Sequence, residues 1–164
     1  MKKIGILGAG GISHSTVPAM IALEEIDCYA VASRSLEKAQ KFAQQYGFQK
    51  AYGSYEEMLR DPEVELVYVA TPHSHHYEHM MLCMAHGKAV LCEKAFTMNA
   101  VQARKVMEYA REHGIFAAEA IWPRYMPSRK MIGDVIASGV IGKVNTLTAN
   151  LSYVIHEVPR IYRP

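Results

Sequence analysis

Residues 4–13 read IGILGAGGIS, and this stretch decides the fold. Its first four residues are mostly apolar, as in a strand buried within a parallel sheet, and the glycines that follow allow a tight turn. Apolar residues continue at Ile12 and Val17, which predicts a helix after the turn. Pro18 is tolerated best if the regular helix begins only near Ser15. A strand, a glycine turn and a helix in this order are expected at the start of a βαβ unit.

The alternation of strand and helix continues along the chain. Further strands are expected near residues 28–33, 48–52, 64–70, 89–92 and 115–121. Helix patterns and short connections separate them, which is typical of a parallel sheet covered by helices on both faces. We therefore predict an α/β fold with a Rossmann-type, doubly wound parallel sheet over residues 1–121.

The pattern changes at residue 122. A helix is expected near residues 127–138, and residues 143–155 then alternate with a period of two. This alternation favours a half-exposed antiparallel strand, unlike the mostly apolar strands before it. We interpret residues 122–164 as the start of a second α+β domain with a mostly antiparallel sheet, truncated after its first strand.

Composition excludes several classes of protein. The 164 residues are 50% hydrophobic and 21% charged, which is ordinary for a globular domain. Eighteen basic against sixteen acidic residues give a net charge of +2, too balanced to indicate nucleic acid as a partner. The longest apolar run, Met80–Ala85, is far shorter than the ~20 residues of a membrane span. The three cysteines are odd in number and lack CxxC spacing, which favours reduced thiols and a cytoplasmic location.

The glycine turn points to a dinucleotide. Residues 8–13 approximate G-x-G-x-x-G, with Ser13 in the last glycine position. In this motif Gly8 permits the turn and Gly10 lets the backbone approach a pyrophosphate. Gly11 and Ile12 lead into the helix, whose free N–H groups favour an anion. The alternative is an ordinary glycine-rich turn between strand and helix.

The end of the second strand indicates which dinucleotide binds. An NAD site usually has an acidic residue there for the ribose 2′-hydroxyl, whereas an arginine suits the 2′-phosphate of NADP. This chain has Ser33 and Arg34 at that position and no carboxylate. NADP(H) is therefore preferred and NAD(H) remains possible. The alternative is that Arg34 is a solvated surface residue.

Two further groups of polar residues follow strands. Residues 71–79 contain four histidines, of which His75 and His79 have the i,i+4 spacing of a metal-chelating helix. No cysteine or carboxylate completes a metal site, so we expect none, and some of these histidines should line the ligand crevice. Glu93 and Lys94 follow the fifth strand, where a lysine can stabilise alkoxide charge or transfer a proton. The alternative for this pair is a surface salt bridge.

Taken together, these motifs resemble the glucose–fructose oxidoreductase / inositol dehydrogenase (Gfo/Idh/MocA) family, with the greatest likeness to its NADP-dependent, dihydrodiol dehydrogenase-like branch. The resemblance implies that Lys94 is the catalytic lysine and that Glu93 and Lys94 contact the cofactor. It further implies cofactor contacts in the motifs around Thr71, Pro72, His73 and His76 and around Trp122 and Arg124.

The sequence departs from the family pattern in three ways. Ala95 replaces the usual proline after the Glu-Lys pair, and His73 replaces the usual asparagine. The family's second catalytic residue, a histidine or tyrosine, is expected beyond residue 164.

The resemblance implies an NAD(P)-dependent oxidoreductase that transfers a hydride between nicotinamide and a CH-OH carbon of a sugar, polyol or cyclic diol. We expect these 164 residues to bind the cofactor without turnover, and the whole enzyme to be a homo-oligomer through its second domain. Two alternatives remain: a non-catalytic NADP-binding sensor or regulator on the same fold, and a metal-binding module that uses the histidines.

Overall fold

The computed structural model describes residues 1–152 and forms two units, the first of which is Met1–Trp122. The strands of this unit are β1 (Lys2–Leu7), β2 (Ile26–Ala32), β3 (Lys50–Tyr52), β4 (Leu66–Val69), β5 (Ala89–Cys92) and β6 (Ala117–Glu119). Its helices are α1 (Gly11–Ile21), α2 (Leu36–Tyr46), α3 (Tyr55–Leu59), α4 (His76–Ala85) and α5 (Ala100–Glu112), with a 3₁₀ turn η1 (His73–His75) before α4.

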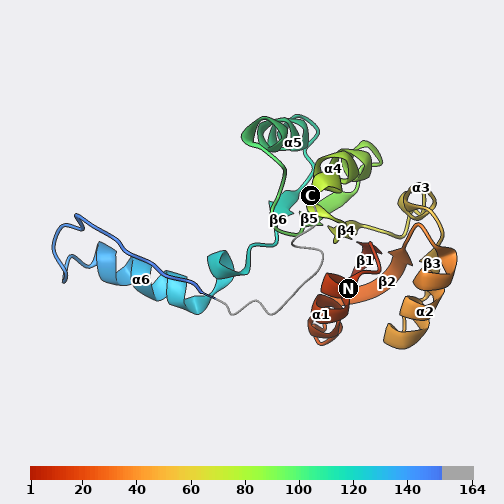
Figure 1. Cartoon of the computed structure of the whole chain (residues 1–164), viewed down its shortest axis with the longest axis horizontal. Helices are drawn as coiled ribbons and strands as arrows, with labels where there is room; N and C mark the ends of the chain where they lie inside the picture. Colours follow the sequence, from red (N-terminus) through yellow and green to blue (C-terminus); the bar gives the residue numbers. More distant parts are fainter. Residues whose placement is uncertain (153–164) are drawn as a thin grey trace. The chain divides into compact units, whose positions relative to one another are not determined.

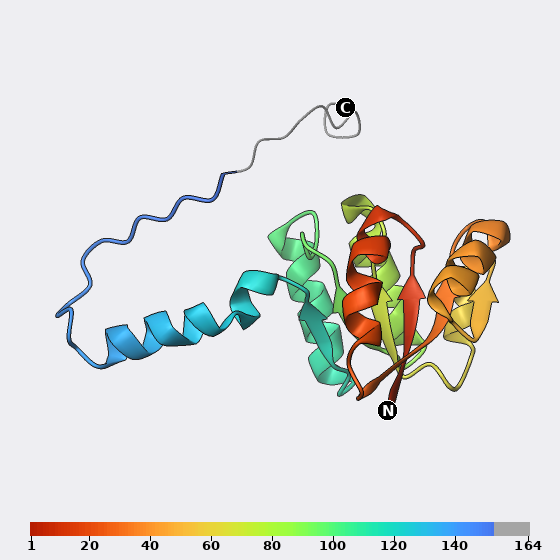
Figure 2. The ribbon, with the colours of Figure 1, turned by 90° about the horizontal axis from the view of Figure 1, so that it is seen from below.

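The predicted Rossmann-type sheet is confirmed. Its six strands are all parallel in the order β3-β2-β1-β4-β5-β6, so the chain returns from one edge to place β4 beside β1. Helices α1 and α2 cover one face, and α4 and α5 cover the other (Figure 1). Figure 2, seen from the side of α1 and α2, shows α1 over the centre of the sheet. Each face has its own buried apolar cluster, one around Ile6 and Phe42 and the other around Val67 and Met80.

Several helices begin or end at residue types that commonly cap helices. The side chains of Ser35, Ser54 and Asn99 each accept a hydrogen bond from the backbone N–H three residues later. Such N-caps satisfy backbone donors that the first helical turn leaves free. Gly47 ends α2 with a φ of +78°, in the left-handed region that favours glycine.

Helix α1 begins earlier than the sequence indicates. It is regular from Gly11, and Pro18 lies inside it rather than near its first turn. Because proline has no N–H, the carbonyl of His14 loses its helical donor. The hydroxyl of Tyr46 in α2 donates a hydrogen bond to that carbonyl at 3.4 Å, which compensates for the missing bond.

The second unit contains a 3₁₀ turn η2 (Trp122–Tyr125), which begins at the last residue of the first unit, and the helix α6 (Pro127–Ala137). The strand expected over residues 143–155 is not formed over 143–152, and residues 153–155 lie outside the described part of the chain. A strand requires a hydrogen-bonded neighbour, and no described residue pairs with this segment. Among residues 1–152, no helix combines the length and apolar content needed to cross a bilayer.

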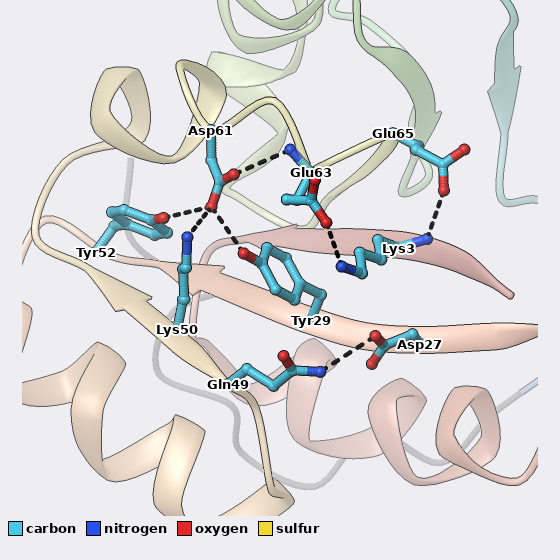
Figure 3. Close-up of polar contacts among 9 residues, drawn as sticks. All are labelled: Lys3, Asp27, Tyr29, Gln49, Lys50, Tyr52, Asp61, Glu63 and Glu65. Carbon is cyan, nitrogen blue, oxygen red and sulfur yellow. Dashed lines mark hydrogen bonds and ion pairs between the residues drawn. The ribbon is translucent and has the colours of Figure 1, made fainter.

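A polar cluster around Asp61 joins β2 and β3 to the loop before β4 (Figure 3). The carboxylate of Asp61 accepts hydrogen bonds from Tyr29 at 3.2 Å, from Lys50 at 2.8 Å and from Tyr52 at 2.6 Å. The backbone N–H of Glu63 donates to its other oxygen at 3.0 Å. Burial alone would raise the pKa of Asp61, but the hydrogen bonds from Lys50, Tyr52 and Glu63 bring this pKa well below its usual range.

We predict that Asp61→Asn lowers the free energy of unfolding by about 2–3 kcal/mol at neutral pH, since a buried, four-fold hydrogen-bonded carboxylate is lost. A lowered carboxyl pKa stabilises the fold above the unfolded-state pKa and loses this effect as the pH falls. Urea unfolding from pH 7 downward should therefore show the two proteins converging below about pH 4. A difference that stays constant with pH would contradict this account.

Candidate functional site

The turn between β1 and α1 passes very close to the end of β4. Gly8 has a φ of +112°, and a Cβ added there would lie 2.9 Å from the carbonyl oxygen of Ala70. Backbone hydrogen bonds hold both sides of this contact, from Gly8 to the Ala32 carbonyl at 2.9 Å and from Ala70 to the Leu7 carbonyl at 3.0 Å. The turn thus requires glycine and lies where β1 and β4 meet, the switch point at which doubly wound sheets bind ligands.

The amino end of α1 is open. Gly10 is its N-cap and Gly11 its first residue, and a Cβ on either glycine would meet no atom within 4 Å. The first helical hydrogen bond runs from the N–H of His14 to the carbonyl of Gly10, so the three preceding N–H groups have no partner in the helix. Open space, free N–H groups and the positive end of a helix suit a pyrophosphate.

Ser13 occupies the place of the third glycine in the motif. It is fully buried, and its hydroxyl donates to the carbonyl of Gly8 at 2.5 Å. A small hydroxyl side chain therefore fits between α1 and the sheet and ties the helix to the turn.

Ser33 and Arg34 follow β2 on one side of the switch point. Ser33 is half-buried, and its hydroxyl accepts a bond from the N–H of Ser35 at 3.4 Å. Arg34 is exposed and lies near Tyr55 of α3: burial raises the pKa of the Tyr55 hydroxyl, and the Arg34 charge lowers it in part. The guanidinium is accessible to a phosphate from solvent.

His76 connects the loops that follow β4 and β5. It is fully buried, and its two ring nitrogens each lie 2.8 Å from a carbonyl oxygen, that of Thr71 on one side and that of Ala95 on the other. The Lys94–Ala95 peptide bond is cis. His76 therefore holds the Thr71–Pro72 loop against the loop that carries Lys94.

The other histidines of this segment do not gather around one point. His73 is exposed, and burial, then His76 and then Lys94 lower its pKa. His79 lies within hydrogen-bond distance of the Thr71 hydroxyl, at 2.9 Å, and its ring stacks with that of His75 at a centroid distance of 5.6 Å. Within residues 1–152, no three histidine, cysteine, aspartate or glutamate side chains are placed to share a metal ion.

Glu93 and Lys94 lie at the carboxyl end of β5 and differ in their surroundings. Glu93 is 8% exposed; one of its oxygens accepts a hydrogen bond from the Tyr68 hydroxyl and the other from the backbone N–H of Lys94 at 3.2 Å. Lys94 itself is exposed. The carboxylate is thus fixed inside the protein, while the lysine side chain is accessible at the carboxyl edge of the sheet.

Trp122 and Arg124 are both exposed and lie in η2. Trp122 closes the first unit, whereas Arg124 belongs to the second. Within the first unit, the turn, Ser33, Arg34 and the loops after β4 and β5 all lie at the carboxyl edge of the sheet.

Two residues at this edge were given no role from the sequence. Tyr68 donates to Glu93, and Glu119 accepts a bond from the backbone N–H of Phe96 at 2.9 Å. Tyr68 lies in an apolar strand and is easily read as a core residue, although its hydroxyl is a signal that a buried acceptor is nearby. Glu119 is the last residue of β6, and a carboxylate at that end of a parallel strand is a usable signal.

Comparisons with known proteins agree with this geometry. Residues 2–119 match the sequence model of the Gfo/Idh/MocA group, described as an oxidoreductase family with an NAD-binding Rossmann fold. Trans-1,2-dihydrobenzene-1,2-diol dehydrogenase from Mus musculus is 41% identical over 158 residues, and the Homo sapiens protein of that name is 40% identical over 158. Each match covers 95% of this chain and 47% of the relative, so the chain spans about half the length of these relatives.

Solved structures are similar as well. A 3-ketoreductase from Actinomadura kijaniata in complex with NADP is 29% identical with a TM-score of 0.79, over 87% of this chain and 45% of that protein. An NAD-binding oxidoreductase from Klebsiella pneumoniae is 30% identical with a TM-score of 0.79, over 86% of this chain and 40% of that protein.

The glycine turn generates a prediction about stability. Gly8→Ala should lower the free energy of unfolding by about 1–3 kcal/mol, because the new Cβ meets the Ala70 carbonyl and the φ is positive. Gly10→Ala is the matched control, since its Cβ meets open space and its φ of −104° suits alanine. Equal stability of the two variants in urea unfolding would contradict the close contact.

Proposed function

The chain belongs to the Gfo/Idh/MocA oxidoreductase family with its NAD-binding Rossmann fold, and from this premise we propose that it is the cofactor-binding half of an NADP(H)-dependent dehydrogenase. The observation that carries the proposal is that the open amino end of α1 and the exposed Lys94 both lie at the carboxyl edge of the parallel sheet. One feature suits a pyrophosphate and the other suits an oxygen that gains negative charge.

The residues present fit an NADP molecule along this edge. The backbone of Gly8, Gly10, Gly11 and Ile12 receives the pyrophosphate, because the glycines leave space and α1 offers free N–H groups. Ser33 and Arg34 receive the 2′-phosphate, since no carboxylate is present there to select the free hydroxyl of NAD. NADP(H) is therefore the preferred cofactor, and NAD(H) is the weaker one.

Further contacts with the cofactor come from the loops after β4 and β5 and from η2. The proposed residues are Thr71, Pro72, His73, His76, Glu93, Lys94, Trp122 and Arg124. Buried His76 acts by holding two of these loops together, and exposed Lys94 is accessible at the carboxyl end of β5.

Lys94 is the proposed catalytic residue. The nicotinamide, when bound, supplies the chemistry of hydride transfer to or from a CH-OH carbon. The Nζ of Lys94 holds the substrate oxygen by a hydrogen bond and stabilises its negative charge as the carbon–hydrogen bond breaks. A lysine at this position also accepts or donates the proton on that oxygen.

The proposed substrate is a small molecule with a CH-OH group: a sugar, a polyol or a cyclic diol. Relatives named for a dihydrobenzene diol and for a 3-keto substrate support this class. Its selection is assigned to the domain that begins at residue 122, with residues 1–121 as the nucleotide-binding domain. A cytoplasmic location accords with free Cys28, Cys83 and Cys92.

The second domain is also the proposed surface for forming a homo-oligomer. Within that unit, α6 and the segment after it line an apolar groove of about 410 Å³. Its walls include Met131, Ile132, Val135 and Ile136, all of them exposed. Exposed apolar patches of this kind mark surfaces that bind another protein.

Cofactor preference gives a direct test with the chain itself. Arg34→Ala should weaken NADPH binding by about 10- to 100-fold and leave NADH binding nearly unchanged, because only NADPH carries the 2′-phosphate. Calorimetric titration of both cofactors measures this, with the exposed Arg60→Ala as a control for charge. Equal losses for both cofactors would remove Arg34 from the 2′-phosphate site.

Catalysis is tested in a chimera that joins this chain to the carboxyl-terminal half of the mouse relative. Lys94→Met should lower kcat by at least about 100-fold, with a much smaller effect on the Kd for NADPH. The 164-residue chain alone should bind NADPH without turnover. A chimera that binds NADPH but does not turn over any diol or sugar would favour a sensor or regulator instead.

A further inference from the structure

Tyr68 occupies an unusual position for a residue of a strand core. It lies in β4, is 1% exposed and packs on the face of the sheet covered by α1 and α2. Its hydroxyl donates a hydrogen bond to the carboxylate of Glu93, beyond the end of the neighbouring strand β5.

We infer that Tyr68 is a positioning residue, which fixes Glu93 and thereby the backbone at Lys94 for the nicotinamide half of the cofactor. This inference rests on the proposed function for the identity of the ligand. Tyr68 lies outside the glycine turn and outside the loops, in a strand whose apolar sequence indicates only a buried core.

The hydrogen bonds of Glu93 explain how Tyr68 acts. One carboxylate oxygen is bound by Tyr68, and the other by the backbone N–H of Lys94. A buried carboxylate needs such partners, because an unpaired one moves toward water or takes up a proton. Burial and the Glu93 carboxylate raise the pKa of the Tyr68 hydroxyl well above its usual value, so that the hydroxyl remains a donor.

The order of the strands indicates which half of the cofactor depends on the Tyr68 hydroxyl. The glycine turn and Arg34 belong to the β1–β2–β3 half of the sheet, which in doubly wound folds receives the adenosine half of the dinucleotide. Glu93 and Lys94 follow β5 in the other half. Loss of the Tyr68 hydroxyl should therefore affect binding of the nicotinamide half and spare the adenosine half.

The test compares Tyr68→Phe with Tyr29→Phe in this chain. Tyr29 is a matched control, because it is 4% exposed and its hydroxyl also donates to a buried carboxylate, that of Asp61. Hydrogen exchange followed by NMR should show faster exchange of the Lys94 amide, by about tenfold, in Tyr68→Phe only. Equal exchange of this amide in both variants would show that Tyr68 does not position Lys94.

Affinity is then measured for NADPH and for 2′-phospho-ADP-ribose, which lacks nicotinamide. Tyr68→Phe should weaken NADPH by about tenfold and leave 2′-phospho-ADP-ribose unchanged, whereas Tyr29→Phe should change neither. In a Glu93→Ala background the substitution at Tyr68 should have little further effect, since it acts through Glu93. The inference would be overturned if Tyr68→Phe weakened NADPH and 2′-phospho-ADP-ribose equally. It would also be overturned if Tyr68→Phe weakened NADPH just as much in the Glu93→Ala background.

If the proposed cofactor is wrong, these measurements give a different result from the one expected if only the role of Tyr68 is wrong. A wild-type chain that binds neither ligand contradicts the cofactor assignment, and the Lys94 amide still decides whether Tyr68 positions the loop. Circular dichroism of each variant confirms that it is folded. A Tyr68→Phe variant that is unfolded while Tyr29→Phe is folded is replaced by Glu93→Gln, which removes the carboxylate that binds both the Tyr68 hydroxyl and the Lys94 amide and should accelerate Lys94 exchange by about tenfold. Unchanged exchange of the Lys94 amide in Glu93→Gln would show that the Glu93 carboxylate does not hold this backbone and would overturn the inference.

Discussion

The contact between the turn at Gly8 and the carbonyl of Ala70 is the constraint on which the rest of the site depends. No side chain fits there, because a Cβ would lie 2.9 Å from that oxygen. The close approach sets the amino end of α1 directly at the point where β1 and β4 meet. The loops after β2, β4 and β5 then end around that point, since the carboxyl ends of parallel strands share one edge of the sheet.

The sequence was sufficient for much of the fold, since its signals were local. Ser35, Ser54 and Asn99 are residue types that commonly cap helices and do so here, and the apolar runs form the parallel strands. Two predictions differ from the structure. Helix α1 starts at Gly11, since Tyr46 satisfies the carbonyl that Pro18 leaves free, and residues 143–152 form no strand in the absence of a described partner.

The contacts that hold the site together were not predictable in the same way. His76 bonds to the Ala95 carbonyl across 19 residues, and Tyr68 bonds to Glu93 across 25. Both depend on how neighbouring strands register, which the periodicity of one segment does not specify. The sequence motifs place the polar residues at the ends of strands, as the structure does. The hydrogen bonds that support these residues depend on how the sheet packs, so the sequence alone did not predict them.

The central claim is that this edge of the sheet holds NADP along the path set by Gly8. A crystal structure of the chain with NADP⁺ tests it most directly. We expect the pyrophosphate at the N–H groups that begin α1, the 2′-phosphate at Ser33 and Arg34, and the nicotinamide beside Lys94. A pyrophosphate bound away from α1, or a nucleotide bound with its nicotinamide over β2 and β3, would contradict the account.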